Sequence, residues 1–176
     1  MSGVDTVAGM VWSWLLELPP VRREVKVAVD LVMDATDDAQ ARQRERHHAE
    51  LVRVERRVGE LPPVRARPGE LQQVLVNLLT NAVQAMPSGG DLVIEAVARE
   101  GAIEIAVEDT GPGVDPAHRD TIFEPFFTTR GSDGGTGLGL AVAREIVLRH
   151  GGAIRLADGR VGARFVVSLP IGRAPR

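Results

Sequence analysis

The sequence predicts a two-layer α/β sandwich, in which helices cover one face of a mixed, mostly antiparallel sheet. The first observation is an amphipathic helix over residues 70–86, whose apolar residues recur every three or four positions. The residues expected in its core face are Leu71, Val74, Leu75, Leu78, Leu79, Ala82, Val83 and Met86. The second is a pair of hairpin patterns, one at 91–99 and 102–109 and one at 153–156 and 163–169. Because a helix with a broad apolar face must bury it, we expect about three helices to cover the sheet.

Length and composition are those of a globular domain with a small appendage. The chain has 176 residues, of which 44% are hydrophobic and 26% charged. A net charge of -3 provides no basic field, so we expect no nucleic-acid binding. The lack of cysteine excludes disulfides, thiolate zinc sites and cysteine nucleophiles, and is typical of a cytoplasmic protein. No apolar run approaches the ~20 residues of a membrane span, so we expect no membrane contact from this chain.

Two helices are predicted before the first strand. Residues 5–18 carry apolar side chains at helical spacing until Pro19 and Pro20 end the pattern. This short helix needs a partner surface, either its own domain or a second copy of the chain. A second helix is expected from about Val25 into the 40s, followed by an edge strand at 51–58.

A column of carboxamides runs beside the apolar face of the helix at 70–86. Its members are Gln73, Asn77, Asn81 and Gln84, and Pro68 is placed to open the helix. Asparagine is unfavourable within a helix because its short amide competes for the backbone. Each Asn could be a solvated or hydrogen-bonded amide. The alternative is that the oxygens of Asn77 and Asn81, ~6 Å apart along the axis, hold a hard cation and the phosphates it carries.

A carboxylate, Asp109, is predicted on the core face at the end of its strand. A buried carboxylate needs hydrogen-bond donors. Asp109 could cap a turn, or it could accept the exocyclic amino group of an adenine. Gly111 and Gly113 would let a flat ligand approach the backbone closely.

A long loop rich in phenylalanine and glycine follows. Three of the four phenylalanines lie within 123–127, and glycines follow them, which indicates a hinged lid. Residues 135–140 then lead into a helix in which Leu140, Val142 and Ile146 are expected core positions. The first backbone N–H groups of this helix could bind phosphate oxygens. The glycine pattern is neither that of a dinucleotide-binding fold nor that of a P-loop, which needs a lysine.

Together these motifs resemble the ATP-binding domain of sensor histidine kinases, in particular the nitrogen-regulator-like subgroup, and more distantly gyrase, Hsp90 and MutL. The matching motifs, in order, are the N box at 77–82, the first glycine box at 109–113, the F box at 123–127 and the second glycine box at 135–140. One such motif would be weak evidence, but four in this order are specific. The resemblance implies a Bergerat-type fold with a flexible ATP lid at about 112–136.

The resemblance also implies a site for ATP and Mg²⁺. By this likeness Asn81 ligands Mg²⁺, Asn77 lines the same ion and the phosphates, and Asp109 accepts the adenine amino group. Relatives that hydrolyse ATP have a water-activating glutamate where this chain has Asn77, which favours transfer to a protein over hydrolysis. Gln84 stands where relatives are often basic, so phosphate neutralisation would rest more on the metal and on Arg130. The other positions implied for the nucleotide are Gly111, Gly113, Thr128, Thr129, Gly135, Thr136, Gly137, Leu138, Gly139 and Leu140.

The family's phosphoacceptor motif, His-Glu followed by Asn-Pro on a dimerisation domain, is not found here. The four histidines, none of which has that context, are His47, His48, His118 and His150. Residues 25–176 are therefore predicted to be an ATP-binding catalytic domain of a histidine kinase that acts on a histidine outside this chain. Residues 1–24 would be a helix and linker that are a remnant or substitute of the dimerisation helices.

The implied partners are ATP or ADP, a phosphoacceptor domain of the full-length protein or of another chain, and a response regulator. A homodimer through the N-terminal helix is a further expectation. Two alternatives stay open: a nucleotide-binding regulatory module without phosphoryl transfer, and a serine kinase of the anti-sigma-factor type.

Overall fold

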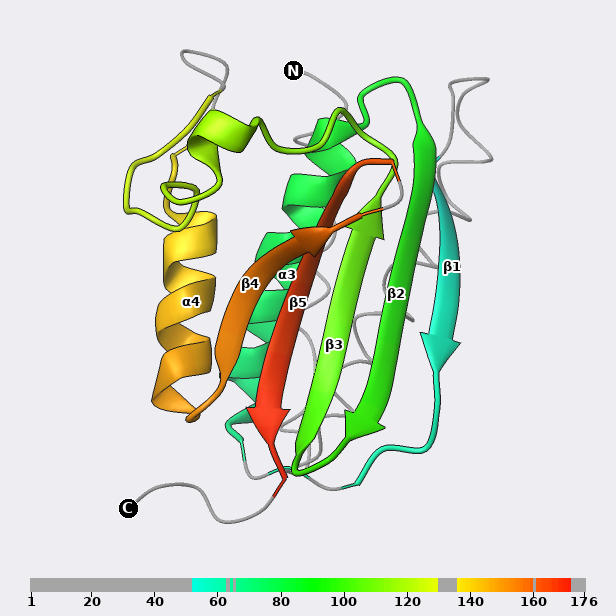
Figure 1. The fold of residues 1–176 in the computed structure, drawn as a ribbon, viewed down its shortest axis with the longest axis vertical. Helices are drawn as coiled ribbons and strands as arrows, with labels where there is room; N and C mark the ends of the chain where they lie inside the picture. Colours follow the sequence, from blue (N-terminus) through cyan, green and yellow to red (C-terminus); the bar gives the residue numbers. More distant parts are fainter. Residues whose placement is uncertain (1–51, 63, 65, 130–135, 160, 172–176) are drawn as a thin grey trace.

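A mixed sheet forms one layer of the domain and helices form the other (Figure 1). The computed structural model describes residues 52–62, 64, 66–129, 136–159 and 161–171. The elements are β1 (Val52–Val58), α3 (Pro68–Ala85), β2 (Gly90–Arg99), β3 (Ala102–Asp109), the 3-10 helix η1 (Pro116–His118), α4 (Gly139–Arg149), β4 (Ala153–Asp158) and β5 (Ala163–Pro170).

The strand order is β1-β2-β3-β5-β4, which confirms the predicted mixed, mostly antiparallel sheet. β1 pairs with β2 in parallel, with Val54 opposite Leu92, and lies at the edge as expected. The other neighbours are antiparallel, including both predicted hairpins. A parallel pair needs a long crossover, and α3 provides it between β1 and β2.

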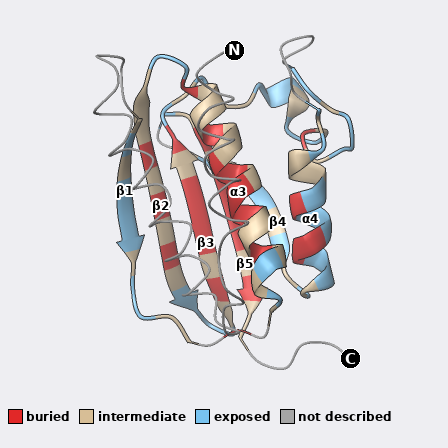
Figure 2. Cartoon of the chain, turned by 180° about the vertical axis from the view of Figure 1, so that it is seen from behind, coloured by how far each residue is buried: buried red, intermediate tan, exposed pale blue. Residues whose placement is uncertain are grey.

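The helices cover one face of the sheet, and most of the buried residues lie on that side (Figure 2). The described residues contain two such helices, α3 and α4. The predicted helices at 5–18 and from Val25, and the proposed boundary at 24/25, lie outside the described residues. No helix in the described part of the chain has the length and hydropathy to cross a membrane.

The opposite face of the sheet carries charged side chains around the buried pair Ala106 and Val166. Arg164 on β5 donates to Glu108 on β3 over 2.6 Å and to Glu95 on β2 over 2.7 Å. These neighbouring carboxylates raise the pKa of the Arg164 guanidinium. The charged ladder explains why apolar residues alternate with charged ones along the strands.

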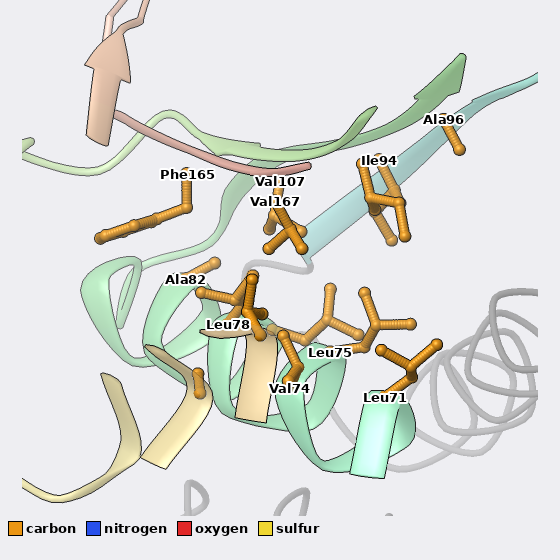
Figure 3. Packing of buried hydrophobic residues seen from close by; sticks show 14 of the residues in the cluster. Leu71, Val74, Leu75, Leu78, Ala82, Ile94, Ala96, Val107, Phe165 and Val167 are labelled. Carbon is orange, nitrogen blue, oxygen red and sulfur yellow. The ribbon is translucent and has the colours of Figure 1, made fainter. Parts of the chain in front are cut away.

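The core forms where α3 lies on the sheet. Leu71, Leu75 and Leu78 point from the helix toward Ile94 and Val167 on the strands (Figure 3). Leu78 is fully buried. Deleting a buried leucine side chain typically costs 2–5 kcal/mol, roughly, so this face holds the two layers together.

Two core predictions were wrong in detail. Val83 on α3 is only half-buried, whereas Val76 is buried and had not been expected in the core. On α4, Val142 is 38% exposed and Ala143 is buried instead. The reason for the difference on α4 is that this helix packs on α3 and on the β4 and β5 side of the sheet, so a strip of its surface stays uncovered.

Candidate functional site

A cavity of about 810 Å³ lies between the C-terminal half of α3, the end of β3 and the start of α4. This volume falls within the roughly 300–1,000 Å³ of small-molecule sites. The cavity brings together most of the positions predicted from the sequence. Those that line it are Asn77, Asn81, Gln84, Asp109, Gly113, Thr128, Thr129, Thr136, Gly137, Gly139 and Leu140.

Of the predicted positions that the structure describes, Gly111 and Leu138 are not among the lining residues. Gly111 is set back behind Asp109, to which its N–H donates. Leu138 is 37% exposed at the N-cap of α4. Arg130 and Gly135 lie outside the described residues. The expected roles of all these positions in nucleotide binding stay predictions.

Asn77 connects α3 to α4. Its Nδ2 donates to the carbonyl oxygen of Gly139 over 2.8 Å, and its Oδ1 accepts from Gln73 Nε2 over 2.9 Å. Because a carbonyl only accepts, the Gly139 contact determines which way the amide points. The Asn77 oxygen keeps one lone pair for another partner.

The next carboxamides of the column face the cavity. Asn81 and Gln84 follow Asn77 along the helix, are half-buried and line the cavity wall. The column is therefore accessible to a ligand and is not sealed in the core. Among the described residues no group of three or more His, Cys, Asp or Glu is arranged to hold a metal ion. The oxygens of Asn81 and Asn77 are the hard donors suited to Mg²⁺, which completes its shell with water and ligand phosphates.

Asp109 is a buried carboxylate with two main-chain donors. It is 3% exposed. Its Oδ1 accepts from the N–H of Gly111 over 2.9 Å and from that of Ala163 over 3.2 Å. Burial raises the pKa of Asp109, the two hydrogen bonds oppose that rise, and Glu108 adds repulsion. Within the described part of the chain both hydrogen bonds use Oδ1, so Oδ2 is the atom that remains for a donor in the cavity.

The β4–β5 turn positions this carboxylate, which the sequence had not indicated. A Cβ at Gly162 would collide with the main-chain oxygen of Asp109 and lie 2.5 Å from its Oδ1. Ala163 both lines the cavity and donates to Asp109. A glycine in a hairpin turn is expected for conformational reasons alone. No local signal distinguished Gly162 as a neighbour of the site.

His118 and Phe127 also line the cavity, and neither had been predicted to do so. Their ring centroids are 5.2 Å apart, with the planes tilted by 59°. Asp115 holds the turn that carries His118, because its Oδ1 accepts from the N–H of Ala117 over 2.8 Å. The predicted lid thus begins with an aromatic pair on the cavity wall.

The described ends of the lid are held together. The N–H of Phe126 donates to the carbonyl oxygen of Gly137 over 2.9 Å. A side chain at Gly137, whose φ is 66°, would collide with the main chain of Phe126. Phe126 itself has a φ of 68°, which is unfavourable for a residue with a Cβ, and its side chain is 74% exposed. Residues 130–135, in the middle of the predicted lid, lie outside the described part.

Comparison with known proteins identifies the family of the chain. The family model described as histidine kinase-, DNA gyrase B-, and HSP90-like ATPase matches residues 66–173. The sensor histidine kinase ZraS of Escherichia coli O157:H7 is 43% identical over 113 residues, which are 63% of this chain and 24% of ZraS. The sensory histidine kinase/phosphatase NtrB of the same organism is 38% identical over 122 residues, which are 63% of this chain and 34% of NtrB.

Solved structures show the same fold. The catalytic domain of histidine kinase ThkA superimposes with a TM-score of 0.71 and 26% identity, covering 84% of this chain and 92% of that domain. The mycobacterial sensor histidine kinase MprB gives 0.68 and 28%, covering 86% of this chain and 97% of the MprB chain. The chain spans about a quarter of ZraS and a third of NtrB. The resemblance inferred from the four motifs is confirmed, and the chain belongs to the family of histidine kinase-, DNA gyrase B- and HSP90-like ATPases.

Proposed function

We propose that this chain is the Mg²⁺-ATP-binding catalytic domain of a two-component sensor histidine kinase. It would transfer the γ-phosphate of ATP to a histidine on a dimerisation domain outside the chain. The observation that carries this proposal is the convergence of Asn81, Asp109 and Gly139, from three different elements, on one cavity. The proposal includes a response regulator as the next acceptor, a homodimer through the N-terminal helix and a cytoplasmic location.

The two ends of the cavity suit the two ends of ATP. Asp109 Oδ2 would accept the adenine amino group, because a buried carboxylate is stabilised by a ligand donor. Gly137 and Gly139 leave the start of α4 open, and the N-terminus of a helix attracts phosphate oxygens. Asn77 holds that helix start against α3 by its hydrogen bond to Gly139.

The amide column would hold Mg²⁺ through Asn81 and Asn77. When bound, the ion neutralises phosphate charge. None of the α3 residues that line the cavity is acidic; they are Val76, Asn77, Thr80, Asn81, Gln84 and Ala85. Without a carboxylate on α3 to act as general base for water, the site favours transfer to a protein acceptor.

An apolar surface beside the cavity supports a protein acceptor. The exposed fraction is 74% for Phe126, 37% for Leu138 and 38% for Val142. Phe126 lies in the predicted lid, Leu138 is the N-cap of α4 and Val142 is in the first turn of that helix. Exposed apolar side chains that gather in one place are typical of docking sites. His150 is an unsuitable acceptor, since both of its ring nitrogens are engaged with main-chain groups.

The first test is calorimetric titration of ATP into wild type and Asn81→Ala, with and without Mg²⁺. We expect the substitution to weaken Mg²⁺-dependent binding by at least about tenfold. Gln72→Ala is the matched control, because Gln72 is a carboxamide of the same helix that does not line the cavity. Equal Mg²⁺-dependent affinity of Asn81→Ala and wild type would remove Asn81 from the site.

The second test asks where the phosphate goes. The domain is mixed with labelled ATP and the dimerisation domain of ZraS or NtrB. We expect acid-labile phosphate on a histidine of the added dimerisation domain. ATP binding without transfer to either would support the regulatory module instead. Acid-stable phosphate on a serine would support the anti-sigma-factor type. Labelled phosphate on a histidine of this chain alone would contradict an external acceptor.

A further inference from the structure

His118 is a cavity residue that the proposed ATP and metal contacts leave without a role. It is the last residue of η1, is half-buried, lines the cavity and packs its ring against Phe127. Phe127 precedes Thr128 and Thr129, which line the same cavity. The His118 ring therefore lies on the cavity wall next to the lid residues that precede Thr128 and Thr129.

The charges of the cavity wall are unbalanced for an anionic ligand. Among the described lining residues the groups able to carry charge are Asp109, Asp115 and His118, and none is Arg or Lys. Two carboxylates repel a triphosphate, which carries several negative charges. The carboxamides of Asn77 and Asn81 bring no net charge. In this part of the chain His118 is the lining side chain that can become a cation near neutral pH.

We propose that the imidazolium form of His118 contacts the phosphates of the nucleotide and makes nucleotide affinity depend on pH. This inference rests on the proposed function, because it assigns one further contact in the same site. Protonation supplies a charge-assisted N–H donor to a phosphate oxygen, which is among the stronger hydrogen bonds. Packing on Phe127 limits the freedom of the ring, so less entropy is lost when it binds.

The charged groups near His118 are mostly acidic. On its own segment and across the cavity they are Asp109, Asp115, Asp120 and Glu124, together with one cation, Arg119. Arg119 is engaged elsewhere, because it donates to Asp158 on β4 over 3.0 Å. Within this described set, His118 is therefore the side chain that could bring a positive charge to the phosphates.

The direction of the pH effect follows from linkage. If phosphate binds the imidazolium form better, bound nucleotide also strengthens the binding of the proton to His118. Affinity should then be highest near pH 5.5 and fall as the pH rises toward 8. A single charge-assisted hydrogen bond corresponds to a change of about tenfold across this range.

The test compares wild type with two variants over this pH range. His118→Phe keeps a ring against Phe127 and removes the charge, and His118→Gln keeps a polar donor without the charge. ATP is titrated calorimetrically into each protein at fixed Mg²⁺. Because ATP and the other histidines titrate equally in every sample, the difference between the wild-type and variant profiles isolates His118. Adenosine serves as the ligand without phosphates.

We expect the ATP affinities of wild type and His118→Phe to differ by about tenfold near pH 5.5 and to converge near pH 8. Adenosine should bind wild type and variant equally at every pH. Identical ATP profiles would overturn the inference, as would the same His118-dependent slope with adenosine, which would assign the ring to the nucleoside.

Nuclear magnetic resonance of the wild-type protein provides a measurement that needs no variant. ATP should shift the titration of the His118 ring to higher pH, and an unchanged titration at saturating ATP contradicts the contact. The two hypotheses fail separately. Absence of ATP binding by wild type at any pH removes the proposed function, whereas binding with a profile unaffected by His118 removes only the present inference.

Discussion

Helices α3 and α4 are joined at both ends of their contact by hydrogen bonds between a side chain and the main chain. We call the end at His150 closed and the end at Asn77, which faces the cavity, open. At the closed end, Nε2 of His150, the C-cap of α4, accepts from the N–H of Arg67 over 3.1 Å. The Nδ1 atom of the same ring lies 2.8 Å from the carbonyl oxygen of Ile146. At the open end, Asn77 of α3 donates to Gly139 of α4. The imidazole is saturated by two main-chain groups, whereas the amide keeps acceptor capacity and faces a cavity.

The difference follows from the relative length of the helices. α4 has 11 residues and α3 has 18, so α4 covers only part of α3. Beyond Gly139, within the described part of the chain, α4 no longer lies against the polar side of α3, and the cavity begins there. In the proposed function the closed end therefore serves stability and the open end binds the ligand. Substitutions at the two ends should separate these two properties.

The largest expected effect on stability is at the closed end. His150→Ala leaves the Arg67 N–H and the Ile146 carbonyl without their side-chain partner, and we expect a loss of about 3 kcal/mol in the free energy of unfolding. ATP affinity should change little, because His150 does not line the cavity. Denaturant unfolding with calorimetry checks both values. His118→Ala is the matched histidine control, and a comparable loss of stability there would contradict the division between the ends.

Gly162→Ala should affect both properties. The new methyl group meets the main chain of Asp109, which cannot yield as a flexible side chain would. We expect a cost of about 2 kcal/mol in the free energy of unfolding, as for overpacking elsewhere, together with weaker ATP binding. Gly59→Ala is the control, because Gly59 resembles Gly162 in lacking a positive φ but has open space around it. ATP binding that survives Gly162→Ala intact would show that Asp109 does not need this support.

Asp109→Asn should separate ligand binding from stability. Burial raises the pKa of Asp109, so the folded protein binds this proton more tightly than the unfolded chain does. The carboxylate therefore lowers stability as the pH rises from the usual Asp range through its raised pKa. The Asn variant should lose that decline, while ATP affinity drops by about tenfold, or about 1.4 kcal/mol.

Unfolding measured across the acidic range checks the sign of the Asp109 effect. Asp109→Ala is the contrasting variant. The amide oxygen of Asp109→Asn can still accept from the N–H groups of Gly111 and Ala163, whereas Asp109→Ala leaves both of these groups without that acceptor. A variant that binds ATP as tightly as wild type would contradict the proposed adenine contact.

The smallest expected effect is a gain in stability at the open end. Phe126→Gly removes a Cβ from a residue with a φ of 68°, and its exposed ring contributes little burial. We expect stability to rise by up to about 1 kcal/mol. Phosphate transfer to an added dimerisation domain should fall if the ring docks the acceptor. Lower stability would indicate that the ring packs against the domain in solution.

Much of the fold and of the candidate site was predictable because their signals are local. Apolar spacing at 70–86 defined α3, alternation with a short turn defined the β2–β3 hairpin, and the carboxamide column followed from helical geometry. Asp109 was expected on the core face from the two-residue period of its strand and is indeed buried.

Other features depended on residues distant along the chain. Gly162 supports Asp109 from 53 positions away in sequence, the ring of His118 meets that of Phe127, and Asn77 reaches Gly139. Local periodicity says which side of an element is apolar, because each side chain repeats at a constant angle. It cannot say which polar atoms of two elements will face one another, since that depends on how the layers pack and on where the shorter helix begins.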